Sequence, residues 1–444
     1  MPNIVYINSH DTGRYIQPYG HEIPTPHLQQ LASEGVIFHN AFSVAPTCSP
    51  SRSGLLTGQC PHQNGMLGLV NHGWKLSDYN KHLVHTLKAA GYVTAQAGVQ
   101  HVAPHPEMIG YDHILTPTTP EHPRNVNQSA KVAAPAAAKF IQSRPQQPFF
   151  LEVGFFETHR PYPAPTPADK AAHITPPSHI ADIPITREDM ASFHASARIM
   201  DDGVGQVLDA LEQMGFADNT LIISTTDHGI SFPEAKCSLA DAGWCVSLIM
   251  RGPREFKPGT ACDAMISHLD VFPTLCEYIG IEKPGWLEGK SFLPVLRGEK
   301  KEINEEIFAE VSYHAAYEPK RAVRTARWKY IKRFDGRTTP VCANADPGPT
   351  KTYWLDNGWT TQPEAEEKLF DLVFDPDERN NLASNPASRA VLNEMRGRLH
   401  NWMTRTNDPI LKGPIALVEG AKTVDPDNPG RDWSVTRAAQ VPTY

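Results

Sequence analysis

The amino-acid sequence predicts an α/β fold: a large, mostly parallel sheet flanked by helices, followed by a smaller α+β domain with a short antiparallel sheet. Two observations predict this architecture. Short apolar runs of β type alternate with helix-length segments up to about residue 300, and a charged stretch there leads into shorter strand-like runs. A chain of 444 residues is also too long for one small core. We therefore expect a first domain over residues 1–300 and a second over residues 301–444.

The expected elements follow from these patterns. In the first domain, the apolar runs that predict strands are 3–8, 92–98, 148–156, 220–229 and 246–252. Three segments between them predict helices, at 82–91, 129–143 and 187–215. The last has apolar residues at helical spacing and ends at Gly215, a residue typical of a helix stop. Beyond residue 300, we expect strands over 306–314 and 327–334 and a helix over 388–406.

Composition excludes several classes of function. The net charge is −8 and no segment is polybasic, which argues against nucleic acid or an anionic membrane as a partner. Apolar runs stay well short of the roughly 20 residues that a membrane-spanning helix needs. The seven cysteines form no CxxC pair, so a zinc knot or a disulfide scaffold is not expected.

The cellular location is expected from the N-terminal residues. The first strand-like run begins at Asn3, which leaves no room for a signal peptide. The expected location is therefore cytoplasmic, or periplasmic or secreted if a leader has been removed. The sequence leaves a homo-oligomer open.

Polar residues follow two of the predicted strands. His10, Asp11 and Arg14 follow the first strand, and Asp227 and His228 follow the strand that starts at residue 220. Ligands of open α/β sheets bind outside the carboxyl ends of the strands. Carboxylate oxygens and imidazole nitrogens are ligands of divalent metals. The four residues His10, Asp11, Asp227 and His228 are therefore candidate metal ligands.

The stretch SVAPTCSPSRSGLLTG, residues 43–58, places Cys48 in a proline-bounded turn directly before a helix-like segment. The N-terminus of a helix presents free N–H groups and the positive end of its dipole, which stabilise anions and anionic nucleophiles. Pro50 is expected to fix the turn, and Ser51 to cap the following helix.

The motif CSPSR at residues 48–52, followed by LLTG, resembles the signature of the type I sulfatases, which are members of the alkaline-phosphatase-like superfamily. Further motifs fall in the family's order over nearly the whole chain: residues 25–43, 98–102 (GVQHV), 157–162 (ETHRPY), 225–229 (TTDHG), 323–331 and 368–383. HQNGM at 62–66 and DHGISFP at 227–233 make the chain most similar to the heparan N-sulfatase (sulfamidase) type.

The resemblance implies a covalent mechanism. In this family the cysteine that matches Cys48 is oxidised to formylglycine, which requires a maturation enzyme as a partner. Hydrated formylglycine is a diol: one hydroxyl attacks sulfur, and the other expels the sulfate as the aldehyde re-forms. Arg52 matches the cation beside the nucleophile, and His101 the base that takes a proton during sulfate release. His159 matches the acid that assists the leaving group, and Lys236 the residue that binds a sulfate oxygen.

The resemblance also implies a metal ion, bound by Asp11, Asp227, the side chain at Cys48 and their neighbours. Family members usually have Asp-Asp and Asp-Asn at the two strand ends, all oxygen donors suited to Ca²⁺. Here the pairs are His10-Asp11 and Asp227-His228. Calcium is the expected ion by family, whereas two imidazoles favour Mn²⁺ or Zn²⁺.

One further departure concerns the sulfate-binding cations. Val99 stands where the family motif has a lysine on the sulfate. Arg14, three residues beyond Asp11, is the candidate to replace that charge.

The second domain is expected to contribute the rim of the substrate pocket. The segment that matches the part of sulfatases reaching back over the cavity contains rings and cations: Tyr313, His314, Tyr317, Lys320 and Arg321. Rings would stack on a sugar, and an arginine would grip a sugar carboxylate with two hydrogen bonds. Tyr313, His314 and Arg321, with Arg14, are the candidate substrate-binding residues.

These observations together predict a sulfohydrolase that removes an O-sulfate or N-sulfate from a small sulfated sugar or oligosaccharide. The Asp-His pair and the missing lysine also resemble the formylglycine-dependent phosphonate monoester and phosphodiester hydrolases, which gives a second candidate activity. A third reading, from another class, is a catalytically silent binding protein that keeps the fold but an unmodified Cys48.

Overall fold

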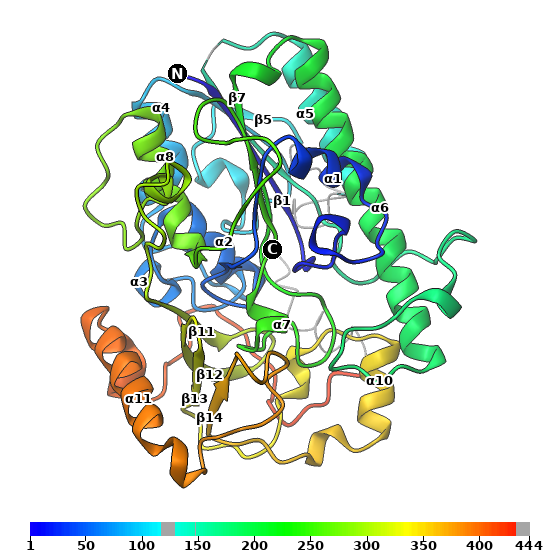
Figure 1. The fold of residues 1–444 in the computed structure, drawn as a ribbon, viewed down its shortest axis with the longest axis vertical. Coiled ribbons are helices and arrows are strands. Elements are labelled where there is room, and N and C mark those ends of the chain that lie inside the picture. The colour runs from blue at the N-terminus through cyan, green and yellow to red at the C-terminus, as the bar shows by residue number, and fades with distance from the viewer. Residues whose placement is uncertain (117–128, 147, 432–444) are drawn as a thin grey trace.

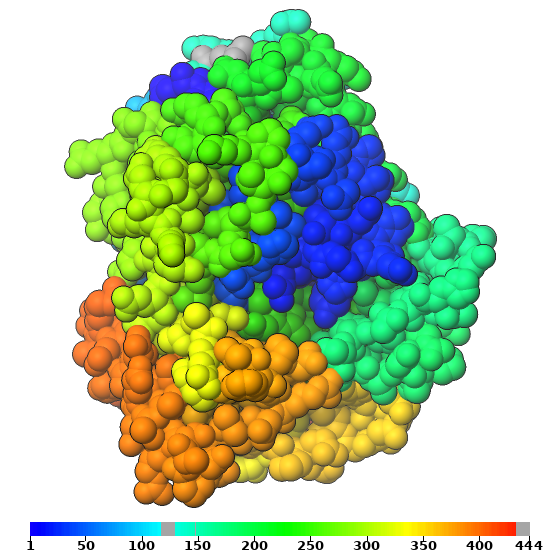
Figure 2. Space-filling model, viewed as in Figure 1, coloured from blue at the N-terminus to red at the C-terminus, as the bar shows by residue number. Residues whose placement is uncertain are grey.

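The structure, a computed structural model, describes residues 1–116, 129–146 and 148–431. Two sheets lie one below the other in Figure 1, the upper one flanked by helices and the lower one made of yellow to orange strands. Figure 2 shows the yellow and orange surface of the second sheet's region lying directly against the green and blue surface of the first. The predicted α/β architecture with a second, smaller antiparallel sheet is confirmed.

The large sheet has eight strands in the order β5-β4-β6-β1-β7-β8-β2-β9. Their bounds are β1 Asn3–Ser9, β2 Val36–Phe38, β4 Val93–Gly98, β5 His113–Ile114, β6 Phe149–Gly154, β7 Thr220–Thr226, β8 Leu248–Arg251 and β9 Thr260–Cys262. All neighbours are parallel except β8, which runs antiparallel to both β7 and β2. The five predicted strands of the first domain are present, but hydrophobic patterning carried no sign of the reversed direction of β8.

Helices cover both faces of this sheet. On one face lie α1 (Pro26–Ser33), α5 (Ala130–Gln142) and α6 (Pro184–Gln213), and on the other α2 (Cys48–Thr57), α4 (Leu83–Ala89) and α8 (Val271–Ile279). Along β1, Ile4 and Tyr6 belong to one core and Val5 and Ile7 to the other, because successive side chains of a strand point to opposite faces. The shorter elements are α3 (Pro61–Asn64), α7 (Asp241–Trp244), α9 (Leu293–Leu296) and the strand pair β3 (Ala41–Phe42) and β10 (Ile266–Ser267).

The second sheet is antiparallel, in the order β11-β12-β13-β14. Its strands are β11 (Glu306–Tyr313), β12 (Tyr317–Thr325), β13 (Trp328–Arg333) and β14 (Glu367–Asp371). Helix α11 (Arg389–Arg405) packs on β12 and β13, and α10 (Pro349–Asp356) packs on α6. Sequence patterning missed β12, because four of its residues are charged and the run does not read as apolar. In the structure most of its residues are nevertheless buried. Residue 300, where the sequence predicts a boundary between two domains, lies between α9 and β11.

Among the described residues, no helix combines the length and the apolar composition that a membrane crossing requires.

A buried carboxyl group lies in the middle of the large sheet. Glu152 of β6 has no exposed surface and sits between Tyr6 of β1 and Gln96 of β4. The Tyr111 hydroxyl donates a hydrogen bond to its Oε2. Burial raises the pKa of Glu152 to about 7, so folding favours the protonated acid.

This acid makes stability depend on pH. The folded state holds the Glu152 proton up to about pH 7, whereas an unfolded glutamate loses it near 4.5, so stability should fall as pH rises from 4.5 to 7. The full effect is about 3 kcal/mol. Glu152→Gln keeps an acceptor for Tyr111 and should remove this part of the pH dependence. Urea unfolding at pH 5 and pH 8 measures it, and parallel profiles for the two proteins would contradict the assignment.

Candidate active site

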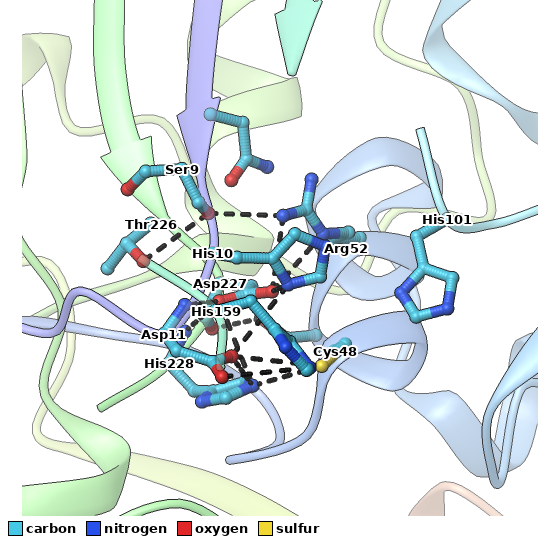
Figure 3. A network of polar contacts seen from close by, with 12 residues as sticks. Ser9, His10, Asp11, Cys48, Arg52, His101, His159, Thr226, Asp227 and His228 are labelled. Atoms are coloured by element: carbon cyan, nitrogen blue, oxygen red, sulfur yellow. Dashed lines mark hydrogen bonds and ion pairs between the residues drawn. The ribbon is translucent and has the colours of Figure 1, made fainter. Parts of the chain in front are cut away.

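The candidate site lies at the carboxyl edge of the large sheet, where β1 and β7 end and α2 begins. His10 and Asp11 follow β1, Asp227 follows β7, and Cys48 is the first residue of α2. One potential ligand atom from each of these four side chains lies within 4.8 Å of the others. Figure 3 shows them turned towards one another, with His101 at the edge of the group. The structure therefore brings together the residues that the two strand ends and the cysteine motif predicted.

The start of α2 differs in detail from the expectation. The helix already begins at Cys48, and the residue before it, Thr47, provides no side-chain cap. The prediction that Ser51 caps the helix is wrong, because Ser51 lies within it. Its hydroxyl instead donates to the backbone carbonyl of Asp227 at 2.5 Å, which ties the helix to the end of β7.

Asp227 is held by contacts from three directions. The Nδ1 atom of His10 lies 2.9 Å from its Oδ2, and the Arg52 Nε–H donates to the same oxygen at 3.2 Å. The Asp11 backbone N–H donates to Oδ1 at 2.9 Å. Burial alone would raise the pKa of Asp227, but His228, His10 and Arg52 hold it well below its usual range. The carboxylate therefore stays ionised and fixed in direction.

His228 presents a nitrogen lone pair towards Asp11 and Cys48. Its Nδ1 lies 2.9 Å from the Gly229 carbonyl, which can only accept, so Nδ1 carries the proton and Nε2 does not. Nε2 lies 3.2 Å from Asp11 Oδ1 and 3.4 Å from Cys48 Sγ. Burial lowers the pKa of His228, which keeps the ring neutral. An imidazole fixed in this way by a backbone carbonyl is the arrangement found at metal ligands, so the residues fit a divalent cation.

His101 follows β4 and lies next to His10, with the centroids of the two rings 5.5 Å apart. Its Nε2 lies 2.7 Å from Asn71 Oδ1, while its Nδ1 is buried without a hydrogen-bond partner. Burial, with His10 next to it, lowers the pKa of His101 well below its usual value. His101 and Asp11 both have positive φ angles, 53° and 51°. Such strained backbone is found at functional sites, where the surroundings enforce it.

Lys236 and His159 complete the group. The Lys236 ammonium lies 2.9 Å from Asp11 Oδ2 and 3.3 Å from His159 Nε2. Burial alone would lower the pKa of Lys236, but Asp11 and Asp346 raise it well above its usual value. The His159 side chain is 18% exposed, whereas those of Asp11 and Lys236 are 0% and 1% exposed. The site therefore opens to solvent at His159.

Two residues at the site were missed by sequence reasoning. Asp346, in the loop between β13 and α10, reaches Lys236 with an Oδ2–Nζ distance of 2.8 Å. Asn71 contacts His101 from a short turn after α3. Neither residue lies at the end of a predicted strand or in a recognised motif, so no signal in one sequence marks them.

The residues predicted for the rim of the substrate pocket have different surroundings in the structure. His314 is buried, its Nδ1 has no hydrogen-bond partner, and burial with nearby Lys236 lowers its pKa well below the usual value; it therefore stays a candidate. Arg321 has no exposed surface and forms two hydrogen bonds to Asp408, at 2.5 and 3.0 Å. The prediction that Arg321 grips a substrate carboxylate is wrong, because its guanidinium is already paired with Asp408 and lies 3.4 Å from Glu310.

The other rim residues are also engaged internally. Tyr313 is buried in a hydrophobic core, and its hydroxyl donates to the Ile415 carbonyl at 2.6 Å. Its ring stacks near Tyr317, with centroids 4.6 Å apart, and Lys320 pairs with Glu318 at 2.8 Å. Tyr313 therefore supports the fold and does not offer an exposed ring to a sugar.

Arg14 does not replace the missing cation. Its guanidinium donates to the His39 carbonyl at 3.1 Å. It lines a cavity of about 380 Å³ beside Asp241 and Cys245, whose described lining includes no other candidate catalytic residue. Val99, at the position of the family lysine, is fully buried. Among the described residues, Arg52 pairs with Asp227 and Lys236 pairs with Asp11.

The carboxyl edge of this α/β sheet, the usual place for a binding site in such folds, gathers a buried cysteine, two carboxylates and several histidines that could hold a divalent metal. The profile of the sulfatase family matches residues 2–281, and the profile described as "N-sulphoglucosamine sulphohydrolase, C-terminal" matches residues 236–347. The chain belongs to the sulfatase family. It is a sulfuric ester hydrolase of the sulfamidase-like type, which confirms the resemblance and the predicted class of enzyme.

Individual relatives and a solved structure of similar fold are also sulfatases. The chain is 29% identical to the human N-sulphoglucosamine sulphohydrolase, over 89% of this chain and 88% of the relative. It is 29% identical to an ulvan-active sulfatase of Formosa agariphila, over 97% of this chain and 86% of the relative. A crystal structure of a putative sulfatase from Bacteroides thetaiotaomicron superimposes with a TM-score of 0.73 at 24% identity, covering 97% of this chain and 99% of that one.

The burial of Arg321 leads to a prediction about stability. Arg321→Ala should cost about 3–5 kcal/mol of unfolding free energy, because it leaves the Asp408 and Glu310 carboxylates without their cation. Arg327→Ala, on the same hairpin, removes an arginine that is 52% exposed and should leave the free energy of unfolding almost unchanged. Chemical denaturation compares the two. A stable Arg321→Ala protein that loses only sugar binding would contradict the structural role.

Proposed function

We propose that the protein removes sulfate from a sulfated carbohydrate, after Cys48 has been converted to formylglycine by a maturation enzyme and a divalent metal has been bound. The observation that carries this proposal is the convergence of Cys48, at the N-terminus of α2, with the candidate metal ligands. Lys236 and His159 contact Asp11, a member of the same group. The sulfated sugar named in the human relative supports a carbohydrate substrate.

Formylglycine would supply a diol nucleophile whose second hydroxyl releases the sulfate. The chain's own residues prepare the site for it. Arg52 places a fixed charge beside the nucleophile, since it is tied to Asp227 and to the Ser9 carbonyl, and its Nη1 has no hydrogen-bond partner. The unpartnered Nδ1 of His101 is free to take a proton during sulfate release.

Lys236 and His159 act on the substrate. The Lys236 ammonium is positioned to bind a sulfate oxygen. His159 is the residue for the leaving atom, because its Nδ1 is bound to the Arg160 carbonyl at 2.5 Å and its Nε2 faces the site. A proton carried on Nε2 would pass to the oxygen or nitrogen that leaves. Both sulfate esters and sulfamates present the same SO₃ group, so the proposal covers O- and N-sulfates.

A metal would stabilise the negative charge that develops on the sulfate oxygens. The candidate ligands are Asp11 and Asp227, the imidazoles of His10 and His228, and the side chain at position 48. Calcium prefers oxygen ligands alone, whereas imidazole suits Mn²⁺ or Zn²⁺. We therefore propose that this member of the family prefers Mn²⁺ or Zn²⁺, with Ca²⁺ as the alternative that the family favours.

Metal removal tests this assignment. Chelation should abolish turnover, and re-addition of Mn²⁺ or Zn²⁺ should restore it better than Ca²⁺. Asp227→Ala should reduce the bound metal by roughly tenfold or more, because it removes an anionic ligand. Asp182→Ala, which removes an exposed carboxylate paired with Arg187, is the matched control and should leave the metal content unchanged. Full activity with no metal detected by elemental analysis would contradict the proposal.

A second candidate activity is hydrolysis of phosphonate monoesters or phosphodiesters, favoured by the Asp227-His228 pair and by Val99. A panel of sulfated mono- and disaccharides, sulfamates, aryl sulfates and phosphonate monoesters distinguishes the two. We expect the highest kcat/KM on a sulfated sugar. Higher values on the phosphonates would replace this proposal. The third reading, a silent binding protein, requires that Cys48 stay a thiol and that no substrate turn over.

A further inference from the structure

We propose that Asp346 is a positioning residue, supplied by the second domain, that holds the Lys236 ammonium against the leaving-group histidine His159. This inference rests on the proposed sulfatase reaction and adds a residue to it. Asp346 lies in the loop between β13 and α10, far in sequence from every other member of the site.

The contacts of Asp346 carry the proposal. Its Oδ2 lies 2.8 Å from Lys236 Nζ, and the Ser231 hydroxyl donates to the same oxygen at 2.5 Å. His159 Nε2 is 4.0 Å away. The Asp346 side chain is 5% exposed, so these contacts are made largely out of water, where a charged hydrogen bond is strong.

The three protons of the ammonium each have an acceptor. Lys236 Nζ lies within 3.3 Å of Asp11 Oδ2, Asp346 Oδ2 and His159 Nε2. His159 Nε2 is an acceptor here because Nδ1 donates to the Arg160 carbonyl. With three acceptors in three directions, the ammonium has one favoured orientation, and in that orientation one N–H points at His159 Nε2.

The same geometry explains why this group is not a second metal site. Asp11, His159 and Asp346 place one potential ligand atom each within 4.8 Å of one another. The Lys236 ammonium is already within hydrogen-bond distance of all three. Lys236 is therefore the cation that these residues bind.

The loop that carries Asp346 is itself fixed against the His159 segment. Gly348 packs on Arg160 so closely that a Cβ atom would lie 2.4 Å from its Nη1. Arg160 makes two hydrogen bonds of 2.7 Å to Asp189, and the Thr350 hydroxyl donates to the same carboxylate at 2.6 Å. The second domain thus sets the position of Asp346 relative to His159 through rigid contacts, which is what a positioning residue requires.

The chemical consequence depends on the leaving group. The ammonium N–H that points at His159 Nε2 is aimed at the place where the leaving atom would contact that histidine, so it can donate a hydrogen bond to the negative charge that develops there. Without the Asp346 charge, the ammonium loses one of its two carboxylate partners, and its orientation towards His159 is lost. A donor at the leaving atom matters most when the leaving group is a poor one, such as a sugar hydroxyl or amine, and least for a nitrophenol. A merely structural role of Asp346 would slow both kinds of substrate equally.

The test compares two substrates in the metal-loaded, matured enzyme. Asp346→Asn keeps the shape of the side chain and removes its charge. We expect kcat on the best sulfated sugar to fall by about tenfold or more, the loss on nitrophenyl sulfate to be roughly threefold or less, and KM to change little. Asp346→Glu should recover part of the lost kcat. Glu364→Gln removes a carboxylate of the second domain that pairs with Arg333 and Lys368, and should behave as wild type on both substrates.

Equal losses on the two substrates, or no loss on either, would overturn the proposal. Gly348→Ala displaces the same loop while keeping the carboxylate, and it should reproduce the unequal losses if Asp346→Asn fails to fold. Wild-type enzyme without activity on any sulfate would reject the proposed function instead, so the two failures are distinguishable.

Discussion

The buried ion pair between Arg52 and Asp227 is the interaction on which the rest of the site depends. Asp227 follows β7 and Arg52 belongs to α2, so the pair joins the edge of the sheet to the helix that begins at Cys48. Neither side chain has exposed surface, and a buried charge that loses its partner costs several kcal/mol. The Ser51 hydroxyl adds a second link between the same two segments. The N-terminus of α2 is thereby held over the two carboxylates.

The charges of the site favour the binding of a further cation. The described residues gather three carboxylates, Asp11, Asp227 and Asp346, and two fixed cations, Arg52 and Lys236. With neutral histidine rings, three negative and two positive charges leave a net charge of −1, next to a ring whose Nε2 carries a lone pair. Such a charge is too costly to bury alone. A bound metal would balance it, while Asp346 keeps Lys236 from being drawn entirely towards Asp11.

Much of the fold and the centre of the site could be predicted from the sequence. Alternating apolar runs predicted the sheet, and the polar residues that end two parallel strands necessarily meet at one edge. The rest depends on contacts that no local pattern records. Arg321 was taken for a substrate-binding residue because its partner, Asp408, lies 87 positions away. Asp346 was overlooked for the same reason, because it lies 110 positions from Lys236 and only the tertiary fold brings the two together.

The central claim is that Cys48 becomes the nucleophile of a sulfatase. The measurement that tests it most directly is the mass of the tryptic peptide that spans Cys48, taken from protein that hydrolyses a sulfate. The account predicts that the thiol is replaced by an aldehyde and that the aldehyde-containing fraction follows the specific activity from one preparation to the next. Active protein in which Cys48 is wholly an unmodified thiol would contradict it.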